Sequence, residues 1–376
     1  MTSSDPSAQS ARAAAGVRVR AMPGLPGAID DAAAIAPPPY RFLRHRWFDA
    51  ALATYGGRAT TLVAEAGGSV VAALPIVPVG LPLARLGGVP GCYWPFRSFP
   101  VAEGAGDAVF AALLDGIAKA VRCLRFGPVY DDDPAFNGLR AAATARGWAV
   151  LPRFVADSYA LDMAALAADG GWPRNSTLRK NRFHEKHLAA HGALDWRFVS
   201  GAEWSDSCFD ALADVEGRSW LAERTDGSDA KFTRTGHGAF WRHAAQDPVL
   251  AEMLWAAVLH VDGVPMAFSF DLNAGARKYA IANSYDPAVG KHSPGKLLYY
   301  RNLQRALGDG MAEVDWGAGD SGYKRVIGAA RGPAIRDWLF LRPGLPALAG
   351  RLIARRWAAS GNPPPAPDDA EEVAAD

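Results

Sequence analysis

Residues 278–324 of this chain read KYAIANSYDPAVGKHSPGKLLYYRNLQRALGDGMAEVDWGAGDSGYK. Alternating apolar and β-branched residues predict strands over 279–284 and 312–316, and apolar residues at helical spacing predict a helix over 295–307. A Pro/Gly turn joins the first strand to the helix, and a Gly-rich loop follows the second strand. The order strand, turn, helix, strand is typical of an α/β unit, and the turn carries most of its chemical information.

The turn reads HSPGKLL over residues 292–298. Pro294 fixes φ where a helix begins, and Gly295 has no side chain to screen the backbone behind it. The first amides of the helix then point outward at the positive end of the helix dipole, which is a geometry that binds phosphate. An ordinary cap, with Ser293 as the capping hydroxyl, is the alternative. The candidate pyrophosphate-binding residues are Lys291, Ser293, Gly295, Lys296 and Leu297.

The composition favours a globular protein with no strongly charged partner. The chain has 376 residues, enough for two domains, and a formal net charge of +1. A net charge this close to zero creates no overall electrostatic field that would attract nucleic acid or acidic partners. Three cysteines, Cys92, Cys123 and Cys208, lie far apart without a CxxC pair, so neither a disulfide framework nor a zinc site is expected. The chain starts without the apolar core of a signal peptide, and a reducing cytoplasm is the expected location.

Other nucleotide, hydrolase and metal signatures are missing from the sequence. Residues 290–297 read GKHSPGKL, which matches a P-loop except that Leu297 replaces the hydroxyl residue that binds Mg²⁺. Neither a G-x-S-x-G elbow nor an H-E-x-x-H motif occurs. His184 and His187 could touch one metal, but neighbouring cationic side chains would repel it, so no metal is expected.

One segment, residues 70–93, is apolar with Arg85 as its only charged residue. Four prolines and four glycines interrupt it, which argues against a continuous membrane-spanning helix. Buried strands joined by a Pro-rich loop are the prediction, and a peripheral membrane contact is the alternative.

The remaining pattern divides the chain into four parts. These are a disordered leader over 1–39, a first domain over 40–160, a second domain over 161–345, and a helix remnant with a disordered acidic tail over 346–376. Asp262-Gly263 is the strongest short hairpin signal. Further helices are predicted over 40–55, 105–121, 134–146, 208–221 and 231–245, and further strands over 60–66, 69–77, 123–126, 148–155, 251–260, 264–272 and 334–341.

A basic helix is predicted over 174–191, which reads RNSTLRKNRFHEKHLAAH. Arg179 and Arg182 on this helix are candidates for contact with an anionic or acidic substrate. The alternative is a solvated basic face that the acidic residues of 203–229 balance. The chain has too little basic charge overall to favour nucleic acid.

Four separated motifs occur in one order: EGRSW (216–220), SYDP (284–287), SPGKLL (293–298) and EVDWGAGDSGYKR (313–325). In this order the chain resembles the acetyltransferases of the cellulose-biosynthesis (CelD/BcsL) type, which belong to the GNAT superfamily and are relatives of the Fem-type peptidoglycan aminoacyl transferases. The resemblance covers residues 41–341 and is strongest from Trp172 onward. It implies an α/β (α+β) fold of two tandem GNAT-like domains, each a mixed, mostly antiparallel sheet flanked by helices. It also implies that the second domain binds acyl-CoA, with SPG in place of the Q/R-x-x-G-x-G/A loop of the superfamily.

The resemblance also implies a lysine at the cleft, near the reacting carbonyl or a substrate phosphate. Fem-like enzymes close their second domain with a pattern similar to D-F-G-G…F-K. The matching residues here are Asp315, Trp316, Gly317, Tyr323 and Lys324.

Acyl transfer to an amine needs a deprotonated amine and a stabilised oxyanion. Lys324 is the candidate oxyanion or anion ligand, Asp320 or Glu216 the candidate base, and Tyr285 the candidate acid for the departing thiolate. Each has a structural alternative: Glu216 as a surface carboxylate, Tyr285 as a core residue, and Asp320 with Lys324 as a loop ion pair. The candidate substrate contacts are Arg179, Arg182, Trp220 and Trp316.

The sequence thus predicts an N-acyltransferase that moves an acyl group from acetyl-CoA or another acyl-CoA to an amine acceptor. Acetyl is the acyl group expected before any other. An amino sugar, a polysaccharide precursor or a small amine is the expected acceptor. The alternatives are a Fem-like transferase that uses aminoacyl-tRNA, and a catalytically silent GNAT-fold binding protein in exopolysaccharide biosynthesis.

Overall fold

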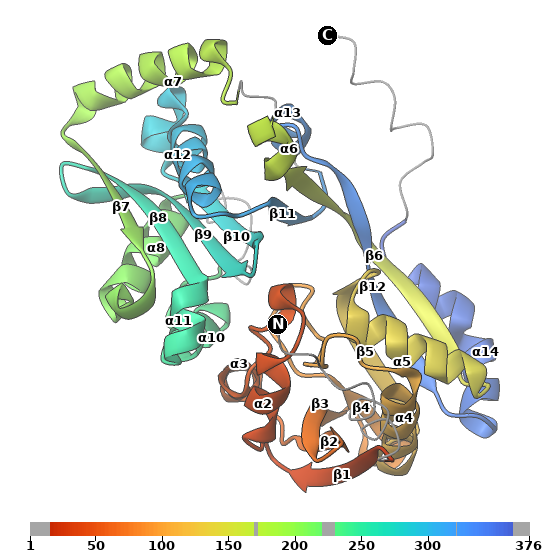
Figure 1. Cartoon of the computed structure of the whole chain (residues 1–376). Coiled ribbons are helices and arrows are strands. Elements are labelled where there is room, and N and C mark those ends of the chain that lie inside the picture. The colour runs from red at the N-terminus through yellow and green to blue at the C-terminus, as the bar shows by residue number, and fades with distance from the viewer. Residues whose placement is uncertain (1–15, 169–171, 220–229, 321, 364–376) are drawn as a thin grey trace, which may run out of the picture.

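A computed structural model describes residues 16–168, 172–219, 230–320 and 322–363. In this part of the chain one 12-stranded sheet runs through the whole molecule, with helices on both faces (Figure 1). The strand order is β1-β2-β3-β4-β5-β12-β6-β11-β10-β9-β8-β7. Neighbouring strands are antiparallel except for the pairs β4–β5 and β10–β11. The predicted fold class, a mixed and mostly antiparallel α/β architecture, is confirmed.

The elements alternate in both halves of the chain. The first half contains β1 (Arg18–Pro23), α2 (Ala28–Ala34), α3 (His45–Tyr55), β2 (Thr60–Ala66), β3 (Ser69–Val79), β4 (Leu86–Gly88), α4 (Asp107–Ala120), β5 (Cys123–Tyr130), α5 (Pro134–Ala145) and β6 (Ala149–Asp162). The second half contains α6 (Met163–Ala168), α7 (Asn175–Leu188), β7 (Leu194–Val199), α8 (Asp206–Arg218), α10 (His237–Ala244), α11 (Pro248–Met253), β8 (Leu254–Val261), β9 (Val264–Ala274), β10 (Arg277–Tyr285), α12 (Pro294–Gly308), β11 (Glu313–Ala318), α13 (Tyr323–Val326), β12 (Ala330–Leu341) and α14 (Leu345–Ala359).

The two halves repeat one topology. The run β2-β3-β4-α4-β5-α5-β6 corresponds, element by element, to β8-β9-β10-α12-β11-α13-β12. The sheet order also reads the same from either edge, with β1 matching β7 and β5 matching β11. Each half has one pair of parallel neighbouring strands, and the two pairs, β4–β5 and β10–β11, occupy equivalent positions in the sheet. The chain is therefore a tandem repeat of one α/β unit.

The last strand of each half is exchanged into the sheet of the other half. β12 pairs with β5, and β6 pairs with β11, while β6 and β12 pair with each other at the centre. This exchange explains why β6 is longer than the strand predicted over 148–155, since its C-terminal end pairs across the boundary predicted at 160. Neither half has a complete sheet without the final strand of the other.

A buried carboxylate holds the exchanged strand in place. Asp337 on β12 is fully buried and accepts hydrogen bonds from Arg125 of β5, with Nη2 to Oδ2 at 2.6 Å. Arg153 of β6 binds the same carboxylate oxygen. Because a buried carboxylate needs cationic partners, this cluster ties three strands of the central sheet together.

Helical layers cover both faces of the second half of the sheet (Figure 1). Ala257 and Leu259 of β8 face α7 and α12, whereas the alternate residues Ala256 and Val258 face α8 and α10. The α8–α10 layer continues into α3 of the first half, where the Trp47 ring meets those of Phe240 and Trp241 at 4.8 and 5.9 Å. This shared aromatic core joins the two halves.

Residues 16–39, predicted to belong to a disordered leader, are ordered. β1 pairs with β2 along its whole length, and Ile29, Ala32 and Ala33 of α2 are fully buried. The correction has a physical cause, because the edge of the sheet and the core beneath it give these apolar residues a partner. Residues 1–15 and 364–376 lie outside the described part of the chain.

The structure corrects the helix predicted over 231–245 and agrees with the prediction for the apolar segment 70–93. The helix predicted over 231–245 is shorter, since α10 begins only after Gly236, whose φ is +60°. Residues 70–93 form β3, β4 and a Pro-rich connection, as predicted, and no helix in the described residues is long and apolar enough to cross a membrane.

Candidate functional site

The parallel strands β10 and β11 separate soon after they meet. They pair only from Arg277–Glu313 to Tyr279–Asp315. Beyond that point β10 continues along β9 and β11 along β6, and a bulge at Ile281 interrupts the register of β10. Because a bulge bends its strand, the C-terminal ends of β10 and β11 diverge, and within the described residues these two strands do not pair with each other beyond Tyr279 and Asp315.

The α12 turn stands at the end of the diverging β10. Ser293 has φ +51° and ψ +49°, a left-handed conformation, and its side chain makes no capping hydrogen bond. The alternative of an ordinary Ser293 cap is therefore wrong. The first helical bond runs from Leu297 N to Ser293 O at 3.0 Å, so the amide of Leu297 is used, and those of Gly295 and Lys296 are left without an intrahelical partner. The predicted phosphate geometry thus rests on two amides.

Tyr285, the predicted acid, lies directly beside this turn. A Cβ on Gly295 would stand 3.1 Å from Tyr285 Cδ1 and 3.2 Å from Asn283 Oδ1. Tyr285 is 38% exposed, so it forms a wall of the turn and is not a core residue.

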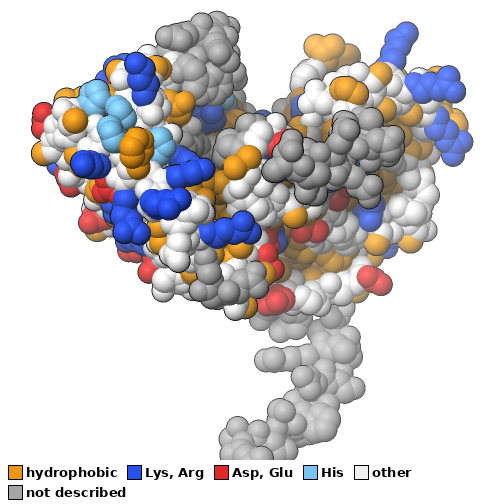
Figure 2. All heavy atoms as spheres, turned by 90° about the horizontal axis from the view of Figure 1, so that it is seen from above, with side chains coloured by type: hydrophobic (Ala, Val, Ile, Leu, Met, Phe, Trp, Pro, Cys, Tyr) orange, Lys and Arg blue, Asp and Glu red, His pale blue; other side chains and the backbone are white. Residues whose placement is uncertain are grey.

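Basic and histidine side chains surround the turn. Lys291 is exposed and Lys296 half-buried. His292, next to Ser293, meets His191 with 2.9 Å between the Nε2 atoms and stacks on His187. Figure 2 shows a histidine cluster with Lys and Arg side chains around it on this lobe of the molecule. Phosphate groups at the turn would therefore meet a basic surface.

The α7 helix supplies the outer part of this surface. Arg179 and Arg182 line a cavity of about 440 Å³ together with Asn175 and Ser176. An ion pair between Glu185 and Arg301 at 2.5 Å anchors α7 to α12. The two predicted arginines therefore lie on an exposed helix that packs on α12, while Trp220 lies outside the described residues.

The side chain of Lys324 binds the end of β11 and the start of the loop that follows it. Its side chain is 3% exposed, and Nζ donates to the carbonyl oxygens of Trp316 (2.8 Å), Ala318 (3.0 Å) and Gly319 (2.6 Å). Burial lowers the pKa of Lys324 to about 8, while Asp315 and Asp320 oppose the shift. Because carbonyl oxygens take up its donors, this geometry gives Lys324 a positioning role in place of direct contact with an oxyanion.

The neighbours of Lys324 are also engaged with the protein. Asp320 pairs with Arg325 at 2.7 Å and accepts a hydrogen bond from the Gly322 amide, which leaves it poorly placed as a base. Trp316 is 6% exposed and packs edge-on against Tyr299 in a hydrophobic core. Its side chain is therefore not available to a substrate, contrary to the prediction.

The end of β11 also contacts the first half of the chain, at Gly317. This glycine has φ +65°, and a Cβ there would lie 2.2 Å from the ring of Trp94. Only glycine combines that backbone conformation with such a close approach. The Gly-rich loop after β11 is thus held from one side by Lys324 and from the other by Trp94.

Asp315 is a titratable group for which sequence reasoning assigned no role. It is 3% exposed at the point where β10 and β11 part, and it accepts a hydrogen bond from the Gly317 amide at 2.6 Å. Burial raises the pKa of Asp315 to about 6, against the opposing hydrogen bond from Gly317 and the charge of Arg277. The D-W-G motif marked this residue, but its burial depends on packing from the first half, including Tyr130.

Asp315 predicts a pH dependence of stability. Its pKa is higher in the folded protein than the usual 3.8, so its contribution to stability is present below about pH 4 and is lost as the pH rises through about 6. The free energy of unfolding of the wild type, relative to Asp315→Asn, should therefore fall between those pH values and then stay constant. Urea unfolding of both proteins at several pH values checks this, and a difference independent of pH would contradict it.

Glu216 lies on α8, which covers the face of the sheet opposite α12. It is 4% exposed, and Oε2 accepts hydrogen bonds from the amides of Lys231 (2.7 Å) and Phe232 (3.1 Å). Burial raises its pKa, which these amides oppose. Two residues further on, Arg218 binds Asp286, the residue after β10, at 2.8 Å. This ion pair fixes the end of α8 beside the end of β10. The low exposure of Glu216 shows that it is not the surface carboxylate of the alternative interpretation.

The structure brings the predicted residues into two groups. One is the α12 turn with Tyr285 at the end of β10, and Glu216 of α8 lies on the opposite face of the sheet. The second is the loop around Lys324 and Asp320. Among the described residues no group of three or more His, Cys, Asp or Glu side chains could hold a metal ion.

Residues 175–325 match the family described as acetyltransferase (GNAT) domain. The match runs from α7 to α13 and so includes the α12 turn, Glu216 and Lys324. No curated protein sequence matches the chain.

Solved structures share the fold over both halves. FemX matches with a TM-score of 0.58 at 11% identity, over 86% of this chain and 97% of that one. A conserved protein of unknown function from Bacteroides thetaiotaomicron VPI-5482 gives 0.53 at 13% identity, over 86% and 100%. L-PGS from Bacillus licheniformis gives 0.52 at 11% identity, over 89% and 97%.

Proposed function

We propose that this chain, an acyltransferase with a GNAT-type acetyltransferase domain over residues 175–325, transfers an acyl group from acyl-CoA to an amine. The observation that carries the proposal is the left-handed Ser293 turn, which presents two helix amides beyond the end of a bulged β10 that has already separated from β11. Acetyl-CoA is the first candidate donor, and the α12 turn is the proposed seat of its pyrophosphate.

The donor would extend from the turn along the separated edges of β10 and β11. Amides of Gly295 and Lys296, with the side chains of Lys291 and Lys296, would bind the pyrophosphate. The unpaired backbone edges beyond Tyr279 would bind the amide groups of the pantetheine arm. Such binding holds the thioester in one place, and that proximity supplies much of the rate acceleration.

The chemical step is aminolysis of the thioester. The amine nitrogen attacks the carbonyl carbon, a C–N bond forms, and the C–S bond breaks as the tetrahedral intermediate collapses; the thiolate leaves and takes up a proton. Glu216 is the proposed acceptor of the ammonium proton, because it is a buried carboxylate on α8 whose pKa burial raises. Lys324 and Asp315 hold the loop after β11 against the site.

The acceptor is proposed to be an amino sugar, a polysaccharide precursor or a small amine, in the cytoplasm where acyl-CoA is made. This part rests on the resemblance to the cellulose-biosynthesis type and on the exposed basic residues of α7. Arg179 and Arg182 would contact an anionic part of such an acceptor.

Calorimetric titration with acetyl-CoA, a long-chain acyl-CoA and free CoA tests the donor. A dissociation constant of about 1–100 μM for at least one of them is the expected result. A mass-spectrometric screen of amines, amino sugars first, would then identify the acylated acceptor. Absence of heat with all three would overturn the proposal.

A second candidate is a Fem-like transferase that uses aminoacyl-tRNA. Its support is the fold shared with FemX and the exposed basic residues of α7. Titration with charged tRNA distinguishes the two: binding of charged tRNA without binding of any CoA species would favour it. A protein that binds CoA but acylates no amine would be a silent member of the fold.

A further inference from the structure

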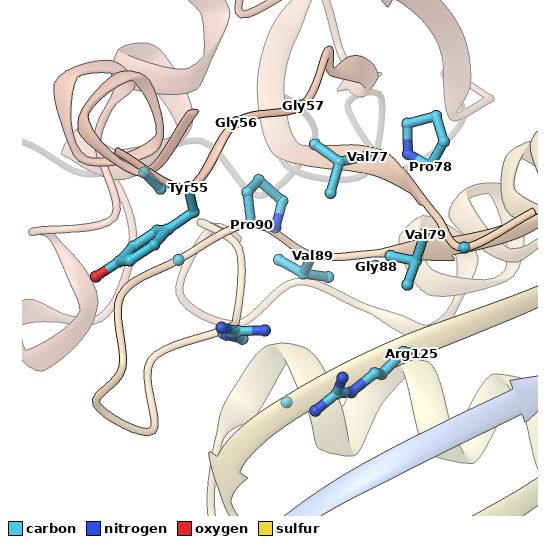
Figure 3. Close-up of a pocket in the computed structure, with 15 residues that line it drawn as sticks. Tyr55, Gly56, Gly57, Val77, Pro78, Val79, Gly88, Val89, Pro90 and Arg125 are labelled. Atoms are coloured by element: carbon cyan, nitrogen blue, oxygen red, sulfur yellow. The ribbon is translucent and has the colours of Figure 1, made fainter. Parts of the chain in front are cut away.

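The first half of the chain contains a pocket at the position that corresponds to the proposed acyl-CoA site. It has a volume of about 370 Å³, and its lining residues all come from residues 51–127 (Figure 3). β4 and β5 pair in parallel only from Leu86–Cys123 to Gly88–Arg125 and then separate, as β10 and β11 do. Gly88, Val89 and Arg125 of the pocket stand where this separation begins.

The walls of the pocket are apolar side chains and glycine backbone. Val77, Pro78, Val79, Val89 and Pro90 surround it, as Figure 3 shows, and Gly56 and Gly57 form an exposed rim. Such walls suit an organic molecule of metabolite size, because apolar surfaces gain by burial and glycines leave the space open.

Two arginines give the pocket its charge. Arg97 and Arg125 both line it, and Figure 3 shows the side chain of Arg125 extending from β5 into the pocket. Arg125 shares Asp337 with Arg153, so two guanidinium groups bind one carboxylate, and Arg97 is close enough for the charges of Arg125 and Asp337 to act on it. The cluster therefore carries an excess of positive charge that the described side chains do not neutralise.

Arg97 is the arginine with spare donors. Its side chain donates a hydrogen bond from Nε to Cys92 O at a long 3.5 Å. Burial and the charge of Arg125 lower its pKa, while Asp337, already bound by the other two arginines, opposes the shift. An oxyanion between Arg97 and Arg125 would relieve this repulsion and accept charge-assisted hydrogen bonds.

The pocket differs from an acyl-CoA site in its helix. α4, which corresponds to α12, begins with Asp107, and a carboxylate in the first turn opposes phosphate at that helix end. The first half therefore keeps the separated strands of the repeat but has lost the pyrophosphate seat.

We propose that this pocket is a binding site for a small organic oxyanion, a carboxylate or a phosphate monoester with an apolar body, held by Arg97 and Arg125. The site is separate from the α12 turn, and the proposal does not depend on acyl-CoA as the donor.

Calorimetric titration with butanoate, phenyl phosphate, inorganic phosphate and acetyl-CoA tests the site, with Arg97→Gln as the main variant. Arg125 is left unchanged because its removal would deprive buried Asp337 of a partner. Arg140→Gln is the matched control, since Arg140 is an exposed arginine on α5 outside the pocket. The comparison of butanoate with phenyl phosphate distinguishes a carboxylate from a phosphate ligand.

Binding of butanoate or phenyl phosphate to the wild type and to Arg140→Gln, weakened at least about tenfold in Arg97→Gln, is the expected result. Arg97→Gln should keep the thermal unfolding midpoint and the acetyl-CoA affinity of the wild type. The proposal is overturned if neither organic anion binds, if inorganic phosphate binds as tightly as phenyl phosphate and butanoate does not bind, or if Arg97→Gln binds them unchanged.

Discussion

Gly295→Glu is expected to remove acyl-CoA binding, with a loss of affinity of about 100-fold or more. The new carboxylate would stand at the two free amides of the α12 turn, where it would repel a pyrophosphate and compete for the same donors. Its Cβ would also press on Tyr285 Cδ1 and Asn283 Oδ1, at 3.1 and 3.2 Å. Calorimetric titration with acetyl-CoA measures the loss.

Gly308→Glu is the matched control. Gly308 ends the same helix, and a Cβ added there meets nothing within 4 Å. This variant should bind acetyl-CoA like the wild type, and both variants should show the wild-type circular dichroism spectrum. Unchanged affinity in a folded Gly295→Glu protein would mean that the pyrophosphate binds elsewhere.

Lys324→Met is expected to lower the free energy of unfolding by about 2–4 kcal/mol. The methionine fills the space of the lysine stem but donates nothing, so the carbonyl oxygens of Trp316, Ala318 and Gly319 lose their common partner inside the protein. Because a buried carbonyl without a donor costs more than the hydrogen bond contributes, the loop after β11 should loosen. Urea unfolding monitored by tryptophan fluorescence measures the change.

The same variant separates a clamp from a catalytic lysine. Lys119→Met, on the exposed side of α4, is the control and should change stability by less than about 0.5 kcal/mol. If Lys324 is a clamp, turnover in Lys324→Met should fall together with stability. Full stability with turnover abolished would instead show that Lys324 contacts the reacting groups.

Local signals in the sequence predicted the elements that local geometry controls. Asp262 and Gly263 have φ of +48° and +79°, as the two-residue hairpin between β8 and β9 requires. Pro294 and Gly295 marked the start of α12 because a helix start depends on the few residues that form it. The turn before α12 could therefore be found from sequence, although the left-handed conformation of Ser293 could not.

The roles of single side chains were less predictable. Trp316 and Lys324 were read as cleft residues from a motif, yet both are buried, one in a hydrophobic core and the other among carbonyl oxygens. Carbonyl partners belong to the backbone and leave no signature in the sequence. Arg97 gave no signal either, because the pocket that it lines forms only where residues of β3, β4 and β5 come together.

The sequence by itself determined the order of strands and helices, the mixed α/β class and the turn before α12. Only the tertiary structure decided that β6 and β12 exchange places, that β1 joins the sheet and α2 the core, and that burial raises the pKa of Asp315 to about 6. The physical reason is range: propensity and turn geometry act over a few residues, whereas strand partners and burial depend on surfaces that meet only when the whole chain has folded.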